Sequence, residues 1–169
     1  MEILQRENIE YAVIGAFALS AHGALRGTTD VDALLLITLP QLTNLGTAFD
    51  QAGFDTELRH GDAEDPIPAM LVLSDSFHNH VELLSGLRGV DPAVFSRAVE
   101  VPLQGVNLRF VGREDLIAMK CFAGGPQDII DAQAAYRSAQ GPIDVDLLRR
   151  VTRRFGREAA DNLEAVLAS

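Results

Sequence analysis

The sequence predicts a mixed α/β (α+β) fold, in which one mixed β-sheet with flanking helices is followed by a helical C-terminal part. Three observations predict it. Short apolar runs bounded by turn residues alternate with helix-forming segments over residues 1–111. Four further helix-forming segments, separated by glycine and proline, fill residues 112–169. The chain has 169 residues, 47% of them apolar, which is enough for one hydrophobic core. We therefore expect an α/β core at residues 1–111 and a helical region at 112–169 within the same compact unit.

Each expected strand is a short apolar run that ends at a turn signal. In chain order, these strands lie at residues 11–14, 30–36, 54–58, 69–73, 80–84, 99–103 and 106–111. Gly15 ends the first strand, and the charged residues 59–68, which include two prolines, form an exposed loop after the third. Asp75-Ser76 and Gln104-Gly105 are the expected turns of two hairpins.

Each expected helix contains good helix formers next to a recognisable start or stop. In chain order, these helices lie at residues 2–8, 16–21, 40–52, 114–122, 127–138, 144–154 and 158–167. His22-Gly23 stops the second helix, and Pro40 occupies the first turn of the third. Gly124-Gly125-Pro126 and Gly141-Pro142 separate the later helices.

Composition excludes several classes of protein. The 24 acidic and 14 basic side chains give a net charge of −10, which argues against broad binding to nucleic acid, and no DNA partner is expected. The single Cys121 excludes an internal disulfide and a multi-cysteine zinc site, and it is expected to be a small buried apolar residue. The longest mainly apolar stretch, residues 33–39, is far shorter than the ~20 residues that span a bilayer, and no signal peptide begins the chain. A soluble, cytoplasmic protein is therefore expected.

Two carboxylates carry the clearest chemical signal. Asp30 and Asp32 stand two apart on a predicted strand, so their side chains point to the same face. Two neighbouring carboxylates repel each other, and a divalent cation such as Mg²⁺ or Mn²⁺ relieves that repulsion. The alternative is a pair of acids that cap loops or meet Arg26.

Two further features belong with this pair. A strand that ends at Gly15 and leads directly into a helix lets a phosphate approach backbone N–H groups. Glu82 is the one acid in the strand-like stretch of residues 80–84. If that strand lies beside Asp30 and Asp32, Glu82 completes a three-carboxylate cluster of the kind used in two-metal phosphoryl chemistry.

The ordered set Gly15-Ala16, Arg26-x-Thr28-x-Asp30-Val31-Asp32 and Glu82 resembles the DNA polymerase β-like nucleotidyltransferase superfamily. Its signature is a glycine followed by Gly or Ser, a spacer, and an acid–hydrophobic–acid triplet on a strand. The match is most similar to small bacterial nucleotidyltransferase-like proteins, including abortive-infection and toxin–antitoxin types. In those proteins Ala-His-Gly commonly precedes the acids, as residues 21–23 do here. Residues 114–120 and 128–131 are similar to the segment that follows the catalytic layer, so the resemblance covers roughly residues 11–136.

The resemblance implies transfer of a nucleoside monophosphate from an NTP, such as ATP, to a hydroxyl acceptor with release of pyrophosphate. The acceptor would be a protein, a tRNA end or a small molecule such as an aminoglycoside. The metal-binding residues would be Asp30, Asp32 and Glu82, with Glu82 also helping to deprotonate the attacking hydroxyl. The nucleotide-binding residues would be Gly15, Ala16, Arg26, Thr28 and Lys120, with Asp128 and Asp131 orienting Lys120 or the metal–nucleotide complex.

Other interpretations stay open. Ala16 stands where the family usually has Gly or Ser, which favours a catalytically weak or inactive protein that acts as an antitoxin or protein-binding partner. A metal-dependent phosphohydrolase would use the same carboxylates, but this sequence lacks the additional His and Asp ligands of such sites.

The histidines and arginines are given structural interpretations. His78 and His80 are interpreted as polar loop residues rather than as a metal pair. A cluster of arginines could bind RNA or an acidic partner, but it is interpreted as a solvated helix face paired with Asp146, Glu158 and Asp161; its members are Arg149, Arg150, Arg153, Arg154 and Arg157.

Overall fold

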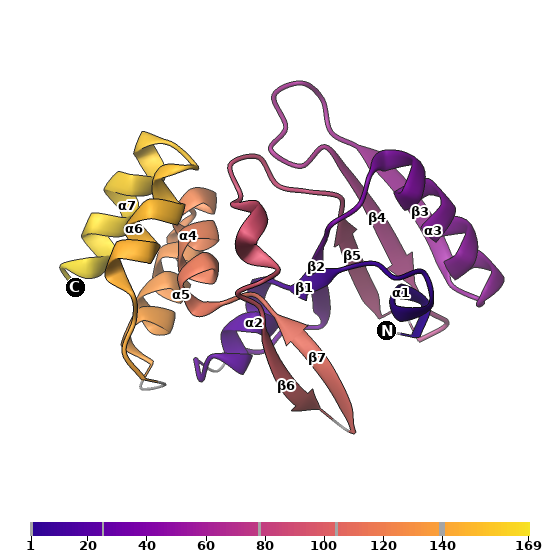
Figure 1. Ribbon diagram of the computed structural model, residues 1–169, viewed down its shortest axis with the longest axis horizontal. Helices are drawn as coiled ribbons and strands as arrows, with labels where there is room; N and C mark the ends of the chain where they lie inside the picture. Colours follow the sequence, from indigo (N-terminus) through magenta and orange to yellow (C-terminus); the bar gives the residue numbers. More distant parts are fainter. Residues whose placement is uncertain (1, 25, 78, 104, 139–140) are drawn as a thin grey trace.

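The computed structural model describes residues 2–24, 26–77, 79–103, 105–138 and 141–169, and it confirms the predicted fold class. Seven strands form one mixed sheet in the order β3-β4-β5-β2-β1-β7-β6 (Figure 1). The strands are β1 (Tyr11–Val13), β2 (Asp30–Leu35), β3 (Asp55–His60), β4 (Ala69–Ser74), β5 (His80–Leu84), β6 (Val99–Leu103) and β7 (Val106–Phe110). The helices are α1 (Glu2–Arg6), α2 (Gly15–Ala21), α3 (Leu39–Gln51), the 3₁₀ turn η1 (Pro92–Val94), α4 (Arg113–Ala123), α5 (Pro126–Arg137), α6 (Val145–Arg153) and α7 (Arg157–Leu167).

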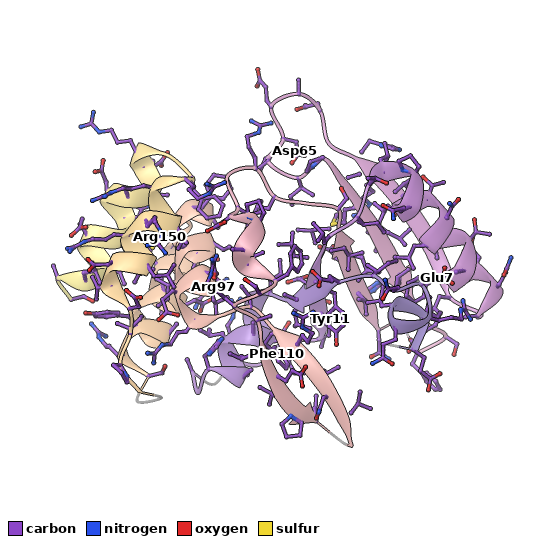
Figure 2. All side chains as sticks on the ribbon, viewed as in Figure 1. Glu7, Tyr11, Asp65, Arg97, Phe110 and Arg150 are labelled. Atoms are coloured by element: carbon purple, nitrogen blue, oxygen red, sulfur yellow. The ribbon has the colours of Figure 1, made fainter. Side chains whose placement is uncertain are left out.

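The short strand β1 lies in the middle of the sheet and joins its two parts. It pairs antiparallel with β2 and parallel with β7, where Val13 is opposite Phe110. Tyr11 and Phe110 are buried here, at the centre of the molecule (Figure 2). Beyond β7, the predicted hairpin of β6 and β7 forms and projects from the body in Figure 1. Gln104, part of the turn expected for that hairpin, lies outside the described residues.

Helix α3 covers one face of the sheet at the end formed by β3 and β4. A Cβ added to Gly46 of α3 would contact Leu71 of β4 at 3.3 Å, and Thr56 of β3 donates a hydrogen bond of 2.6 Å to Asp50 of α3. Because side chains alternate along a strand, Asp55 and Glu57 point to the opposite face, and both are exposed. This alternation leaves an open sheet face on β3, which β4 separates from the acid-bearing strand β5.

The predicted end of the third strand is wrong by two residues. Residues 59 and 60 belong to β3 rather than to the exposed loop expected over residues 59–68. Arg59 pairs with Met70 and His60 pairs with Ala69, so the antiparallel ladder with β4 extends the strand by two residues. Both side chains are exposed, and the apolar pattern therefore carries no signal of strand at these positions.

The C-terminal helices form a bundle that stands to one side of the sheet in Figure 1. Helix α4 is its centre: Leu116, Ile117 and Cys121 are fully buried, and α4 packs against α5, α6 and α7. Gly124 ends α4 in the left-handed region at φ 67°, as expected for a helix C-cap. No helix in the described part of the chain is long and apolar enough to cross a membrane.

The arginine cluster on α6 and α7 is mostly engaged within the fold. Arg157 lies 3.7 Å from Asp161, one of the predicted partners. Arg149 makes two hydrogen bonds of 2.9 Å to Glu164 one helix away, whereas Asp146 and Glu158 were expected as the partners. Arg154 donates to the carbonyl oxygens of Gly89 and Val90. The correction arises because tertiary packing brings Glu164 and the 89–90 backbone within reach.

Candidate active site

The turn between β1 and α2 brings the backbone directly against one of the two predicted carboxylates. Gly15 is the first residue of α2 and has a φ of +67°, in the region that favours glycine. A Cβ added there would lie 2.2 Å from Oδ2 of Asp32. The amide N–H of Ile14 also donates to the carbonyl oxygen of Asp32 at 2.8 Å. Only a glycine at this turn permits such a close approach of backbone to carboxylate.

Parallel pairing of β2 with β5 sets the positions of the three acids. Asp32 is opposite Glu82, and Asp30 is opposite His80. Because directly paired residues share a face, Asp30, Asp32 and Glu82 point to the same side of the sheet. All three line a cavity of about 340 Å³; its other lining residues are Gly15, Ala16, Arg26, Thr28, Lys120, Gln127 and Asp128.

Electrostatic repulsion concentrates on Asp32. Burial raises the pKa of this carboxyl above its ordinary value, and the negative charges of Glu82 and Asp30 raise it further, while Lys120 opposes them. A divalent cation would relieve this repulsion, so the carboxylates suit Mg²⁺ or Mn²⁺. Across the described residues, however, no group of three or more His, Cys, Asp or Glu side chains forms a set that could hold a metal ion by itself. The donors therefore fit an ion that takes one or two carboxylates and completes its shell with substrate phosphates.

Opposite the carboxylates, two cations are held by two acids of α5. Nζ of Lys120 lies 2.7 Å from Oδ1 of Asp128 and 3.0 Å from Oδ2 of Asp131. Arg26 contacts the same Oδ2 of Asp131, so its partner is an acid of α5 and neither Asp30 nor Asp32. The side chain of Asp131 is only 3% exposed. Burial alone would raise the pKa of Asp131, but hydrogen bonds from Gln127 and Lys120 and the nearby positive charges lower it below its ordinary value.

The loop that carries Arg26 and Thr28 is anchored at both ends. Ser20 of α2 donates a hydrogen bond of 3.2 Å to the carbonyl oxygen of Arg26. The hydroxyl of Thr28 accepts from the amide N–H of Asp30 at 3.1 Å. These contacts hold the start of β2 and place Arg26 across the cavity from it.

The structure brings nine of the ten predicted site residues into the lining of this one cavity. The tenth, Asp131, lies behind the lining, where it pairs with Lys120 and Arg26. Gln127 was not predicted as a site residue; it lines the cavity and donates a hydrogen bond of 3.0 Å to Asp131. Its position four residues before Asp131 on a helix that begins at Pro126 is the signal that could have found it.

The histidines take different places. His22 is the C-cap of α2, as expected; it is buried, and its Nε2 lies 2.7 Å from the carbonyl oxygen of Val111. His80 is the first residue of β5 and not a loop residue, and its Nδ1 lies 2.9 Å from Oγ of Ser74 on β4. His78 lies outside the described residues. Strand pairing thus confirms the predicted strand at residues 80–84 and corrects the interpretation of His80 as a loop residue, because Ser74 is its direct partner.

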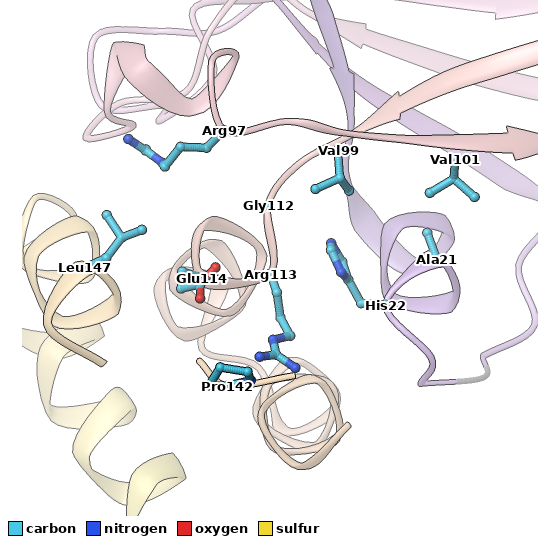
Figure 3. A pocket seen from close by; sticks show the side chains of 10 residues that line it. All are labelled: Ala21, His22, Arg97, Val99, Val101, Gly112, Arg113, Glu114, Pro142 and Leu147. Carbon is cyan, nitrogen blue, oxygen red and sulfur yellow. The ribbon is translucent and has the colours of Figure 1, made fainter. Parts of the chain in front are cut away.

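A second cavity of about 510 Å³ lies at the other ends of α2 and α4 (Figure 3). It contains none of the three acids. Its polar side chains hold the surrounding backbone: Arg113 donates to the carbonyl oxygens of Ser138 and Gly141, and Glu114 accepts from the amide N–H of Asp144. We therefore assign these groups a structural role and take the carboxylate cavity as the candidate active site.

Two comparisons with known proteins rest on the sequence. A family model described as "Nucleotidyltransferase of unknown function (DUF6036)" matches residues 1–165. No curated protein matches the sequence.

Solved structures give a likeness of fold. The solution structure of the antibiotic-resistance factor ANT(2'')-Ia superposes with a TM-score of 0.62 at 12% identity, covering 99% of this chain and 90% of that chain. The crystal structure of ANT(2'')-Ia in complex with adenylyl-2''-tobramycin gives a TM-score of 0.60 at 12% identity, covering 91% of each chain. The lincomycin-bound lincosamide antibiotic adenylyltransferase LnuA gives a TM-score of 0.53 at 9% identity, covering 82% of this chain and 92% of that chain. At these identities the likeness shows the fold alone.

Proposed function

The chain belongs to the nucleotidyltransferase family DUF6036, and we propose that it transfers a nucleoside monophosphate from an NTP to a hydroxyl acceptor in a metal-dependent reaction that releases pyrophosphate. One observation carries the proposal. The glycine turn, the three acids and the cations Lys120 and Arg26 all open into a single cavity. Metal-binding and phosphate-binding groups are therefore adjacent, as nucleotidyl transfer requires.

Asp30, Asp32 and Glu82 would hold Mg²⁺ or Mn²⁺. A metal ion held there would supply neutralisation of the charge that develops at the reacting phosphoryl group. The raised pKa of Asp32 supports this role, because burial and the negative charges of Glu82 and Asp30 disfavour its ionised form, and a bound divalent cation would favour it. Asp30 stands two residues before Asp32 on β2, and Glu82 is opposite Asp32 on β5, so each could share an ion with it.

Lys120 and Arg26 would contact the triphosphate from the side opposite the acids. In the free protein their charges are matched by Asp128 and Asp131, so the four side chains are neutral as a group. A triphosphate would compete for the two cations, while Asp131 would keep them in place. At the turn, the backbone N–H groups of Gly15 and Ala16 have no Cβ at Gly15 to keep a phosphate away.

A small molecule is the acceptor that the comparisons support best, ahead of a tRNA end or a protein hydroxyl. ANT(2'')-Ia has been solved with adenylyl-2''-tobramycin, and LnuA is a lincosamide adenylyltransferase. The net charge of −10 also makes an RNA acceptor less favourable. We extend this preference to the present chain as part of the proposal, with ATP as the first donor to test.

The test is calorimetric titration of ATP, GTP, CTP and UTP with Mg²⁺ into the wild-type protein and into Asp30→Ala/Asp32→Ala. A matched control, Glu100→Ala/Glu158→Ala, removes two exposed acids outside the cavity. We expect micromolar binding of at least one NTP by the wild type and the control, and its loss in the first variant. Transfer is then followed with α-labelled nucleotide and a panel of hydroxylated small molecules. A folded wild-type protein that binds no NTP would contradict the proposal and favour a non-catalytic partner-binding role, to which Ala16 already points.

A further inference from the structure

The acceptor must approach the nucleotide from a direction that the structure already limits. In an in-line displacement, the attacking oxygen and the leaving pyrophosphate lie on opposite sides of the phosphorus. This step rests on the proposed function, which places the triphosphate against Lys120, Arg26 and the turn at Gly15. The turn at Gly15 follows β1, which lies on the side of β2 away from β5, and both Lys120 and Arg26 contact Asp131 of α5. The acceptor would therefore approach from the other side, over β5 and β4.

The strand register shows which residues face that approach. On β5, His80 stands two residues before Glu82, so the two side chains share a face. His80 is opposite Asp30 on β2 and opposite Ser74 on β4. It is exposed and is not part of the lining of the phosphate cavity. It thus stands just outside that cavity, on the side where the acceptor would enter.

Ser74 orients the imidazole of His80. Its Oγ lies 2.9 Å from Nδ1 of His80, and both residues are on rigid, directly paired strands. This contact occupies one ring nitrogen. The other, Nε2, makes no hydrogen bond or ion pair with any residue that the structure describes. An oriented polar atom without a protein partner, beside a predicted catalytic acid, is suited to bind a substrate hydroxyl.

We propose that Nε2 of His80 binds the hydroxylated acceptor, and that Ser74 is its positioning residue. The acceptor then carries two polar groups: the hydroxyl that attacks the phosphorus near Glu82, and a second hydroxyl or amine that hydrogen-bonds to His80. The substrate class is a small molecule with neighbouring hydroxyl or amino groups. Neither residue takes a metal or phosphate in this assignment, so nucleotide binding does not depend on them.

Two substitutions at one position separate the two ring nitrogens. Asn places an amide near the position of Nδ1 and keeps the contact with Ser74, whereas Gln extends an amide to the position of Nε2. We expect His80→Asn to raise the acceptor KM about 3- to 10-fold, the effect of losing one ordinary hydrogen bond, and His80→Gln to restore most of it. Ser74→Ala raises the same KM by a smaller factor. The KM for Mg-ATP and kcat change less than twofold in all three variants.

The assay measures transfer from α-labelled ATP to tobramycin, lincomycin and glycerol as probes, with kinetics on the fastest acceptor. His60→Asn is the matched control, because His60 is an exposed histidine on the α3-facing side of β3. An unchanged acceptor KM in His80→Asn overturns the inference and leaves the proposed function intact. Binding of Mg-ATP without transfer to any probe overturns the proposed transfer and the inference with it, because all three probes carry hydroxyl groups. A wild-type protein that binds no NTP overturns the proposed function and the inference together.

Discussion

Substitution of Gly15 by alanine tests the contact between the first turn and the acids most directly. The new Cβ would lie 2.2 Å from Oδ2 of Asp32, a distance that no real Cβ contact tolerates, so the carboxylate or the turn must move. The left-handed backbone at φ +67° adds a strain of about 1–2 kcal/mol for any residue with a Cβ. Gly15→Ala therefore combines a backbone cost with displacement of a proposed metal ligand.

A second glycine separates these two effects. Gly53 has a φ of +89°, and nothing lies within 4 Å of a Cβ added there. Gly53→Ala should lose about 1–2 kcal/mol of unfolding free energy, which lowers the Tm of a chain of this size by roughly 2–8 °C. Gly15→Ala should lose at least as much unfolding free energy as Gly53→Ala. Gly15→Ala should also lower the rate of nucleotidyl transfer by about 100-fold, because a misplacement of about 1 Å can cost about that factor in rate.

The assay is thermal unfolding of both variants together with calorimetric titration of Mg-ATP and a transfer rate. We expect Gly53→Ala to bind Mg-ATP as the wild type does, and Gly15→Ala to bind it weakly or not at all. If Gly15→Ala were destabilised only as much as Gly53→Ala and kept wild-type affinity and rate, the turn would not position Asp32. The assignment of the cavity would then be wrong.

Three further predictions concern the buried charges and the thiol. Folding lowers the pKa of Asp131 from its ordinary value of 3.8, so its ionised carboxylate stabilises the folded state at a pH above 3.8. This contribution is lost as the pH falls through the lowered pKa of the folded state. Lys120→Met raises this pKa, so acid unfolding should begin at a higher pH in denaturant titrations between pH 7 and pH 3. Arg97 binds both carboxylate oxygens of Asp115 at 2.7 Å, and Asp115 is 3% exposed; Arg97→Ala should therefore cost about 3 kcal/mol in urea unfolding, and an unchanged midpoint would refute this role. Burial raises the pKa of Cys121 to about 12, so a thiol reagent at pH 8 should not modify the native protein but should modify one thiol per chain in denaturant.

Local sequence signals anticipated most elements because each rests on a short-range cause. Gly124 ends α4 since only a residue that tolerates a positive φ fits this C-cap, and Pro126 begins α5 since proline suits the first turn of a helix. The two strand residues that were missed, Arg59 and His60, are exposed and polar. They are held in β3 by hydrogen bonds to β4 rather than by a burial pattern.

In the candidate site, too, some features follow from local sequence and others only from strand pairing and packing. Periodicity alone places Asp30 and Asp32 on one face of a strand, and a glycine between strand and helix indicates a turn that backbone or ligand can approach closely. The proximity of Glu82 to Asp32 depends on which strands pair and in which register, and neither is encoded within a single segment. The same holds for Gln127 in the cavity and for the contact between Ser74 and His80.

The sequence by itself thus determined the kinds of groups present: an acid pair, a glycine turn, and one lysine with nearby acids on helices. Only the tertiary structure decided their distances, that Asp131 is shared by Lys120 and Arg26, and that Glu82 completes the acids. The physical reason is range. Side-chain periodicity and backbone conformation act over a few residues, whereas this site joins residues from 15 to 131, which packing of the whole core brings together.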